Sequence, residues 1–171
     1  ALGQSVESLW SMENGYALCS AGGLQAISEH LELLSQDQVN ALAGKLRIGV
    51  HLDVEVTDSD ASQRPLVSQV FCSALPVAYS SIPATQWKSF ATLVLQAAYE
   101  ATLWAAVSNA ERGVSNVVFL TRLGGGAFGN DDDWIHPAIR NALTMARGTE
   151  LDVRLVSYGP PTAAVTQLVK D

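Results

Sequence analysis

Charged residues are scarce in this sequence, and positive charge is the scarcer kind. Charged side chains make up 16% of the 171 residues, with 10 Lys and Arg against 17 Asp and Glu and a formal net charge of -7. So little charge beside 48% hydrophobic residues excludes the composition of a disordered chain. The negative balance disfavours general nucleic-acid binding, because the chain and the phosphate backbone carry the same sign. We expect one folded domain over residues 1–171, a common domain size.

Cysteines and long apolar runs are scarce too. Cys19 and Cys72 have no CxxC spacing and are too few for the disulfide framework of a small secreted domain. No apolar run approaches the roughly 18 uninterrupted residues of a membrane span, and the chain does not open with a basic segment followed by an apolar one. These absences predict free thiols, no membrane partner and a cytoplasmic location.

Helical and strand periodicities alternate along the chain. Strands that alternate with helices of ten or more residues predict an α/β fold with a largely parallel sheet flanked by helices. The expected helices are residues 24–34, 37–46, 85–112 and a segment that starts between Asp132 and His136 and stops at Gly148. The expected strands are residues 14–19, 46–58, 66–74, 116–121 and 151–158, and the tail after them is weakly patterned. In the long helix, Tyr99 and Trp104 are expected to be core residues.

The most concentrated chemical signal is a glycine-rich loop between a predicted strand and the helix after it. Gly124, Gly125, Gly126 and Gly129 stand in RLGGGAFGN, directly after the apolar run NVVFLT. Glycine permits positive φ and close backbone approach, so successive N–H groups can converge on a diphosphate. Ligands of open α/β sheets bind beyond the carboxyl ends of the strands, where this loop is expected. The alternative is a tight turn that only connects strand and helix.

Several nucleotide and metal chemistries are disfavoured by what surrounds the loop. It is neither GxGxxG nor GxxxxGKS, and no Lys follows the glycines, so a P-loop with Mg-nucleotide chemistry is not expected. Asp131, Asp132 and Asp133 suit the first turn of the next helix, although their charge competes with a phosphate there. Three consecutive residues cannot all point at one ion, so we expect no metal site, and an Mg²⁺-dependent nucleotide enzyme is only a weaker alternative.

These stretches together resemble the macrodomain-like ADP-ribosyl hydrolases. The resemblance rests on VSQVFCSALPVAY, AYEATLWAAVSNAERG and NVVFLTRLGGGAFGNDDDWIHPAIRNAL; it covers about residues 46–157 and is most specific in LTRLGGGAFGN. It implies a three-layer sandwich with a mixed, largely parallel sheet between helices. It also implies an enzyme that removes ADP-ribose from a protein side chain, arginine above all. ADP-ribosylated ubiquitin is among the substrates of that branch, and no cofactor is implied.

The resemblance also implies how the loop is used. Its residues would hold the diphosphate and distal ribose of ADP-ribose, with the aromatic ring against that ribose. The matching residues are Gly124, Gly125, Gly126, Ala127, Phe128, Gly129 and Asn130. Such a protein works in the cytoplasm, or in the cytosol of a host if it is a secreted effector. Ordinary macrodomains open with further strands and an Asn-rich loop that residues 1–45 lack, so part of the sheet and site could lie upstream.

Carboxylates in the strand predicted at 46–58 are the candidates for the hydrolytic step. Asp53 and Glu55 alternate with apolar residues and are expected on one face of that strand, and Asp58 follows in the loop. Cleaving an ADP-ribosyl bond requires stabilising a positively charged sugar centre and activating water, which suits a carboxylate. The same residues could bind the guanidinium of a target arginine, or be ordinary surface charges. A non-catalytic ADP-ribose-binding module is the alternative function.

Overall fold

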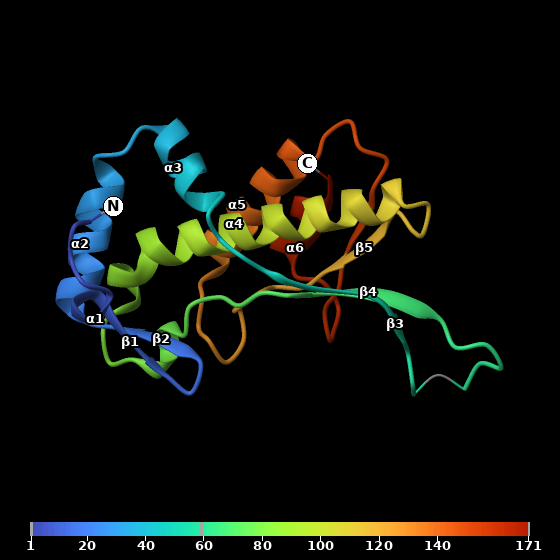
Figure 1. The fold of residues 1–171 in the computed structure, drawn as a ribbon, viewed down its shortest axis with the longest axis horizontal. Helices are drawn as coiled ribbons and strands as arrows, with labels where there is room; N and C mark the ends of the chain where they lie inside the picture. Colours follow the sequence, from blue (N-terminus) through green and yellow to red (C-terminus); the bar gives the residue numbers. More distant parts are fainter. Residues whose placement is uncertain (1, 59, 171) are drawn as a thin grey trace.

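A computed structural model describes residues 2–58 and 60–170, and Figure 1 shows their arrangement. Within these residues the chain is a mixed α/β protein with small sheets, which confirms the expected α/β class. Its helices are α1 (Val6–Leu9), α2 (Ala21–Glu32), α3 (Gln36–Ala43), α4 (Ala84–Glu111), α5 (Asp132–Met145) and α6 (Ala163–Lys170), with a 3-10 turn η1 at Val77–Tyr79. Its strands are β1 (Trp10–Glu13), β2 (Tyr16–Cys19), β3 (Gly49–Glu55), β4 (Leu66–Phe71), β5 (Val117–Leu120) and β6 (Asp152–Leu155).

The expected helices and strands are all present, with ends displaced by a few residues. Three elements were not expected: α1 and β1 at the start of the described chain, and α6 in the weakly patterned tail. Each has at most eight residues, too short for a reliable periodicity.

Strand pairing differs from a single, largely parallel sheet. Within the described residues β1–β2 and β3–β4 are antiparallel pairs, and only β5–β6 is parallel. Strands β4 and β5 run in the same direction along one side of α4 (Figure 1), but no ladder joins them. The three-layer sandwich with a largely parallel sheet is therefore not confirmed.

Helix α4 runs through the middle of the molecule and forms the core with α5 (Figure 1). Its deepest side chains follow a spacing of three to five residues and are almost fully buried; they are Trp87, Ala91, Leu95, Ala98 and Leu103. From α5, Ile135 and Ile139 are also buried, and burying a side chain of this kind contributes about 1.5–3 kcal/mol. The expectation that Trp104 is a core residue is wrong, because its side chain is 50% exposed. A helix that is apolar on most sides has no single stripe from which the buried face can be read.

The same composition gives α4 the length and hydropathy of a membrane span. This is a weak indication, because the core helix of a soluble protein passes the same test. Here α4 packs against α2, α3 and α5. The expected absence of a membrane partner stays a prediction.

Two neighbouring glycines in the first turn of α2 test how closely this helix approaches α1. A Cβ at Gly23 would lie 2.1 Å from the backbone oxygen of Leu9, whereas a Cβ at Gly22 would meet nothing within 4 Å. We expect Gly23→Ala to destabilise the protein by about 1–3 kcal/mol. Gly22→Ala should raise stability by up to about 1 kcal/mol. Urea unfolding followed by circular dichroism measures both, and equal effects would contradict the close approach.

Candidate functional site

Two of the loop glycines are required by the backbone. Gly124 has φ 76° and Gly129 has φ 68°, both in the left-handed region that favours glycine. A Cβ at Gly124 would lie 2.4 Å from the Cβ of Ala74, and one at Gly129 would lie 2.8 Å from the Cβ of Ala78. At Gly126, by contrast, φ is ordinary and a Cβ would meet nothing within 4 Å. A connecting turn therefore explains glycine at 124 and 129 but not at 126.

The tip of the loop presents free backbone donors. Gly125 N–H donates to the Arg122 carbonyl, and Gly129 N–H donates to the Gly126 carbonyl, each at 3.0 Å. Within the described residues, the consecutive N–H groups of Gly126, Ala127 and Phe128 have no acceptor. Gly126 and Ala127 are exposed. Consecutive free amides at an exposed turn can bind an anion without any positive side chain.

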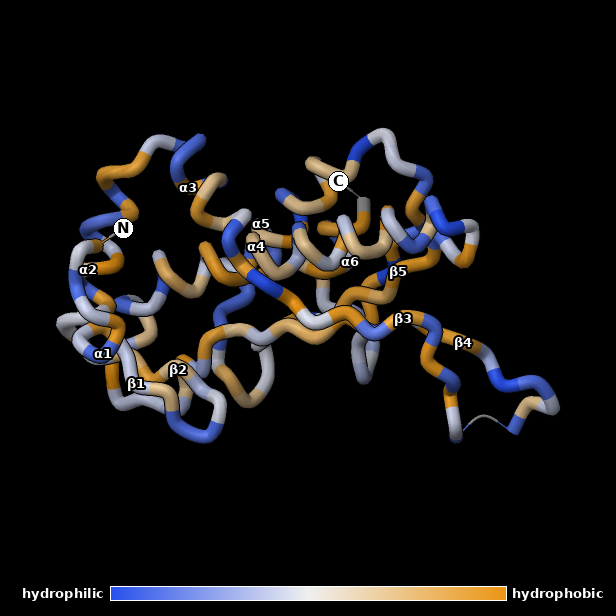
Figure 2. Tube along the Cα trace, in the orientation of Figure 1, coloured by the Kyte–Doolittle hydropathy of each residue, from blue (hydrophilic) through white to orange (hydrophobic). Residues whose placement is uncertain are grey.

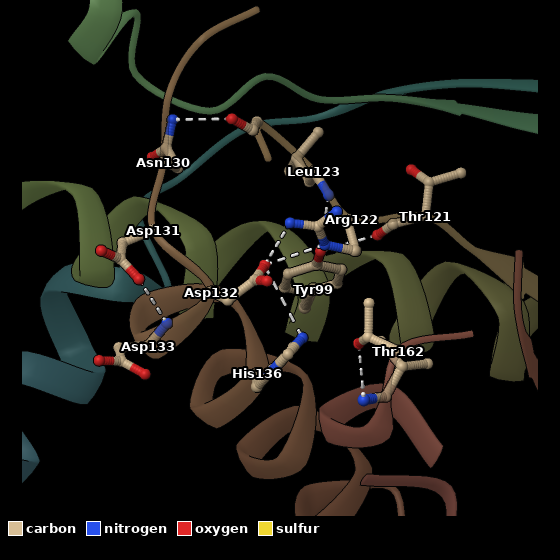
Figure 3. A network of polar contacts seen from close by, with 12 residues as sticks. Tyr99, Thr121, Arg122, Leu123, Asn130, Asp131, Asp132, Asp133, His136 and Thr162 are labelled. Atoms are coloured by element: carbon tan, nitrogen blue, oxygen red, sulfur yellow. Dashed lines mark hydrogen bonds and ion pairs between the residues drawn. The ribbon is translucent and has the colours of Figure 1, made fainter. Parts of the chain in front are cut away.

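Asn130 supports the loop from inside the molecule. Its side chain is 4% exposed, and Nδ2 donates to the Leu75 carbonyl at 2.8 Å (Figure 3). Its backbone N–H donates to the Gly124 carbonyl at 2.9 Å, which closes the loop. Its Oδ1 is buried without a partner among the described residues. Asn130 therefore positions the loop.

Phe128 belongs to a cluster of three aromatic rings. Its ring centroid lies 5.5 Å from that of Tyr16 and 5.4 Å from that of Tyr79, both edge-on. The two tyrosines are themselves edge-on at 5.3 Å. Because Phe128 is half-buried and Tyr79 is 49% exposed, the cluster forms an aromatic wall beside the free amides.

A charged group that sequence reasoning did not single out lies beside the loop. The Arg122 guanidinium pairs with Asp132, with Nε 2.9 Å from Oδ1 (Figure 3). An Arg122 terminal nitrogen lies 3.2 Å from the position a Cβ would take at Gly125, so a positive charge adjoins the glycines. His136 Nε2 is 3.8 Å from the same Asp132 oxygen, one helical turn further along α5. The position of Arg122 directly before the glycines, and the four-residue spacing of Asp132 and His136, were the available signals.

The acidic triplet is partly accounted for by this arrangement. Asp131 caps α5, as expected, because its Oδ1 accepts from the Asp133 backbone N–H at 3.0 Å. Asp132 is neutralised by Arg122. Two of the three carboxylates thus have local partners, which weakens their competition with a bound phosphate.

Tyr99 joins α4 to the chain segment that leads into the loop. Its hydroxyl donates to the Thr121 carbonyl and accepts from the Leu123 N–H, both at 2.8 Å (Figure 3). The side chain is buried, as expected. Burial raises the pKa of Tyr99 to about 12.

The carboxylates predicted for catalysis lie away from the loop. Asp53 has φ 55° at a bulge in β3 and pairs with Arg112, the C-cap of α4. Arg112 is 13 residues beyond Tyr99, or about 20 Å along the helix. Glu55 pairs with Arg64 at 2.7 Å. The bulge interrupts the alternation on which a shared face was predicted.

The remaining candidates give no further chemistry. Asp58 is exposed in the turn after β3, and the structure does not bring it to the loop. Cys19 and Cys72 are free thiols, and burial raises the pKa of Cys19 to about 11 and that of Cys72 above its usual value. Among the residues that the structure describes, no group of three or more His, Cys, Asp or Glu could hold a metal ion.

Comparison with known proteins gives no match among family models, curated proteins or solved structures.

Ionisation of Tyr99 couples its hydrogen bonds to pH. Because its pKa is raised from 10.0 to about 12, the folded state favours the neutral phenol. Its contribution to stability is fully present below pH 10 and is lost as pH rises through about 12. We expect Tyr99→Phe to cost about 1–3 kcal/mol at pH 8 and to lose less stability than the wild type above pH 10. Tyr158→Phe, at a fully exposed position, is the control. Parallel losses in wild type and Tyr99→Phe, measured by urea unfolding, would contradict this role.

Proposed function

We propose that this chain binds ADP-ribose, with the diphosphate on the loop of residues 124–130. The observation that carries the proposal is the row of three free amides at Gly126, Ala127 and Phe128, next to Arg122. A diphosphate needs several donors, and neutral amides supply them whatever the net charge of the protein. The aromatic wall of Tyr16, Tyr79 and Phe128 offers a surface for a ribose or base.

The architecture we propose for the complete domain is the three-layer sandwich of a macrodomain, with a largely parallel sheet. Two features support it. Strands β5 and β6 form a parallel pair connected through α5, and β4 and β5 run in the same direction beside α4 (Figure 1).

The reaction we propose is hydrolysis of the bond between ADP-ribose and a protein arginine. It rests on the resemblance of LTRLGGGAFGN and its neighbours to the macrodomain-like hydrolases. Among the carboxylates near the loop, Asp132 is the candidate to activate water or orient the arginine, since Asp131 is used as a cap and Asp53 lies at the far end of α4. ADP-ribosylated ubiquitin in the cytoplasm, or in a host cytosol, is the proposed substrate.

A non-catalytic ADP-ribose-binding module is the second candidate function. The specific observation in its favour is that Asp53 and Glu55 are each paired with an arginine and lie away from the loop. In that function Asp132 only holds Arg122 in place. Binding and hydrolysis therefore need separate measurements.

Binding is tested by calorimetry with ADP-ribose. Because a Cβ at Gly126 meets no neighbour, Gly126→Glu should fold and place a negative charge among the free amides. We expect at least a tenfold loss of affinity. Gly22→Glu makes the same charge change at an open position in α2 and should bind like the wild type. Absence of binding by the wild type, or equal binding by Gly126→Glu, would contradict the proposed site.

Hydrolysis is tested with arginine-ADP-ribosylated ubiquitin by mass spectrometry of the released ADP-ribose. We expect Asp132→Asn to slow release by about 10²–10⁴-fold while ADP-ribose binding is retained. Asp53→Asn, which removes a carboxylate at the far end of α4, should change the rate less than twofold, or about 0.4 kcal/mol. Tight ADP-ribose binding without release by the wild type would exclude the hydrolase and leave the binding module.

A further inference from the structure

A groove runs between β4 and β5, over one side of α4. Its volume is about 470 Å³. Val70 lies on the β4 side, Val117 on the β5 side, and Thr102 and Ala105 of α4 form part of the lining. The groove is distinct from the glycine loop, whose residues 124–130 do not line it.

Both strands that border the groove have a free edge. Within the described residues β4 is hydrogen-bonded only to β3, and β5 only to β6. Each strand therefore carries a row of backbone N–H and C=O groups without a partner strand on its other side. The two strands run in the same direction and are not in contact as a ladder (Figure 1).

The lining specifies the charge of an occupant. None of the side chains that line the groove is acidic or basic. The polar groups that remain are backbone dipoles of alternating sign along the strand edges and a few neutral side chains such as Asn109. A complementary occupant thus has no charged side chain facing the groove and presents alternating N–H and C=O groups.

The exposed apolar side chains of the same strands indicate that the sheet is incomplete. Val67 is 40% exposed, Phe71 is 58% exposed and Phe119 is 64% exposed. Hydrophobic residues continue along β3, β4 and β5 in Figure 2. Exposed apolar residues beside unpaired edges mark a place where another strand can add.

We propose that the groove binds an extended polypeptide strand from outside residues 1–171, uncharged and apolar at alternate positions. The strand pairs with β4 on one side and with β5 on the other, which joins β3–β4 and β5–β6 into one sheet. Strand β5 has four residues and β4 has six, so about four to six residues of the occupant are paired. A compact small molecule would fill the groove but leave both edges unpaired. This inference does not depend on ADP-ribose binding.

The test uses a synthetic peptide of alternating Val and Thr between terminal lysines, labelled for fluorescence anisotropy. The same peptide with N-methylated valines cannot donate along one edge and is the peptide control. We expect the unmodified peptide to bind at least tenfold more tightly than the methylated one. Hydrogen exchange of the backbone amides of β4 and β5 should slow when it binds.

A pair of variants locates the binding. Ala105→Glu puts a charge into the lining of the groove, whereas Ser108→Glu puts the same charge on an exposed position of α4 outside it. Only Ala105→Glu should weaken binding, by at least tenfold. No binding of the peptide, or binding without protection of β4 and β5, would overturn the proposal. A dimer in light scattering that Ala105→Glu converts to a monomer would assign the groove to a second copy and overturn it too.

Discussion

The burial of helix α4 is the constraint on which the rest of the structure depends. Its 28 residues span about 42 Å, and apolar side chains occur on most of its sides. Leaving such a helix in water would forfeit about 25 cal/mol for each Å² of apolar surface. Helix α5 covers one side, and α2 and α3 cover others near its start. The groove between β4 and β5 is the side where the cover is incomplete, which is why a missing strand follows from the same constraint.

The proposed binding loop is fixed in place by its connections to this core. Tyr99 of α4 holds the chain at Thr121 and Leu123, directly before the glycines. Asn130, directly after Gly129, is bonded to the Leu75 carbonyl. With both ends held by buried polar groups, the free amides between them need little ordering when a ligand binds. The position of the loop is therefore a consequence of core packing, while the glycine sequence determines only its local shape.

Local features of this protein could be predicted from the sequence, and long-range ones could not. The periodicity of 85–112 and the glycines after NVVFLT predict α4 and the loop, because both signals lie within a few residues of each other. The bulge at Asp53 and its pairing with Arg112 depend on residues 59 positions apart, which no periodicity encodes. The approach of Arg122 to Asp132 likewise depends on how the loop folds back onto α5. Which strands pair is decided by tertiary packing, so the single parallel sheet could not be checked against the pattern alone.

The central claim is that the free amides of residues 126–128 bind a diphosphate, and a crystal structure of the protein soaked with ADP-ribose tests it most directly. The account predicts diphosphate oxygens within hydrogen-bond distance of the backbone nitrogens of Gly126, Ala127 and Phe128, with Arg122 turned toward them. It also predicts that the ribose or adenine lies against the ring of Phe128 or Tyr79. ADP-ribose bound elsewhere on the protein, with these amides still facing water, would contradict it.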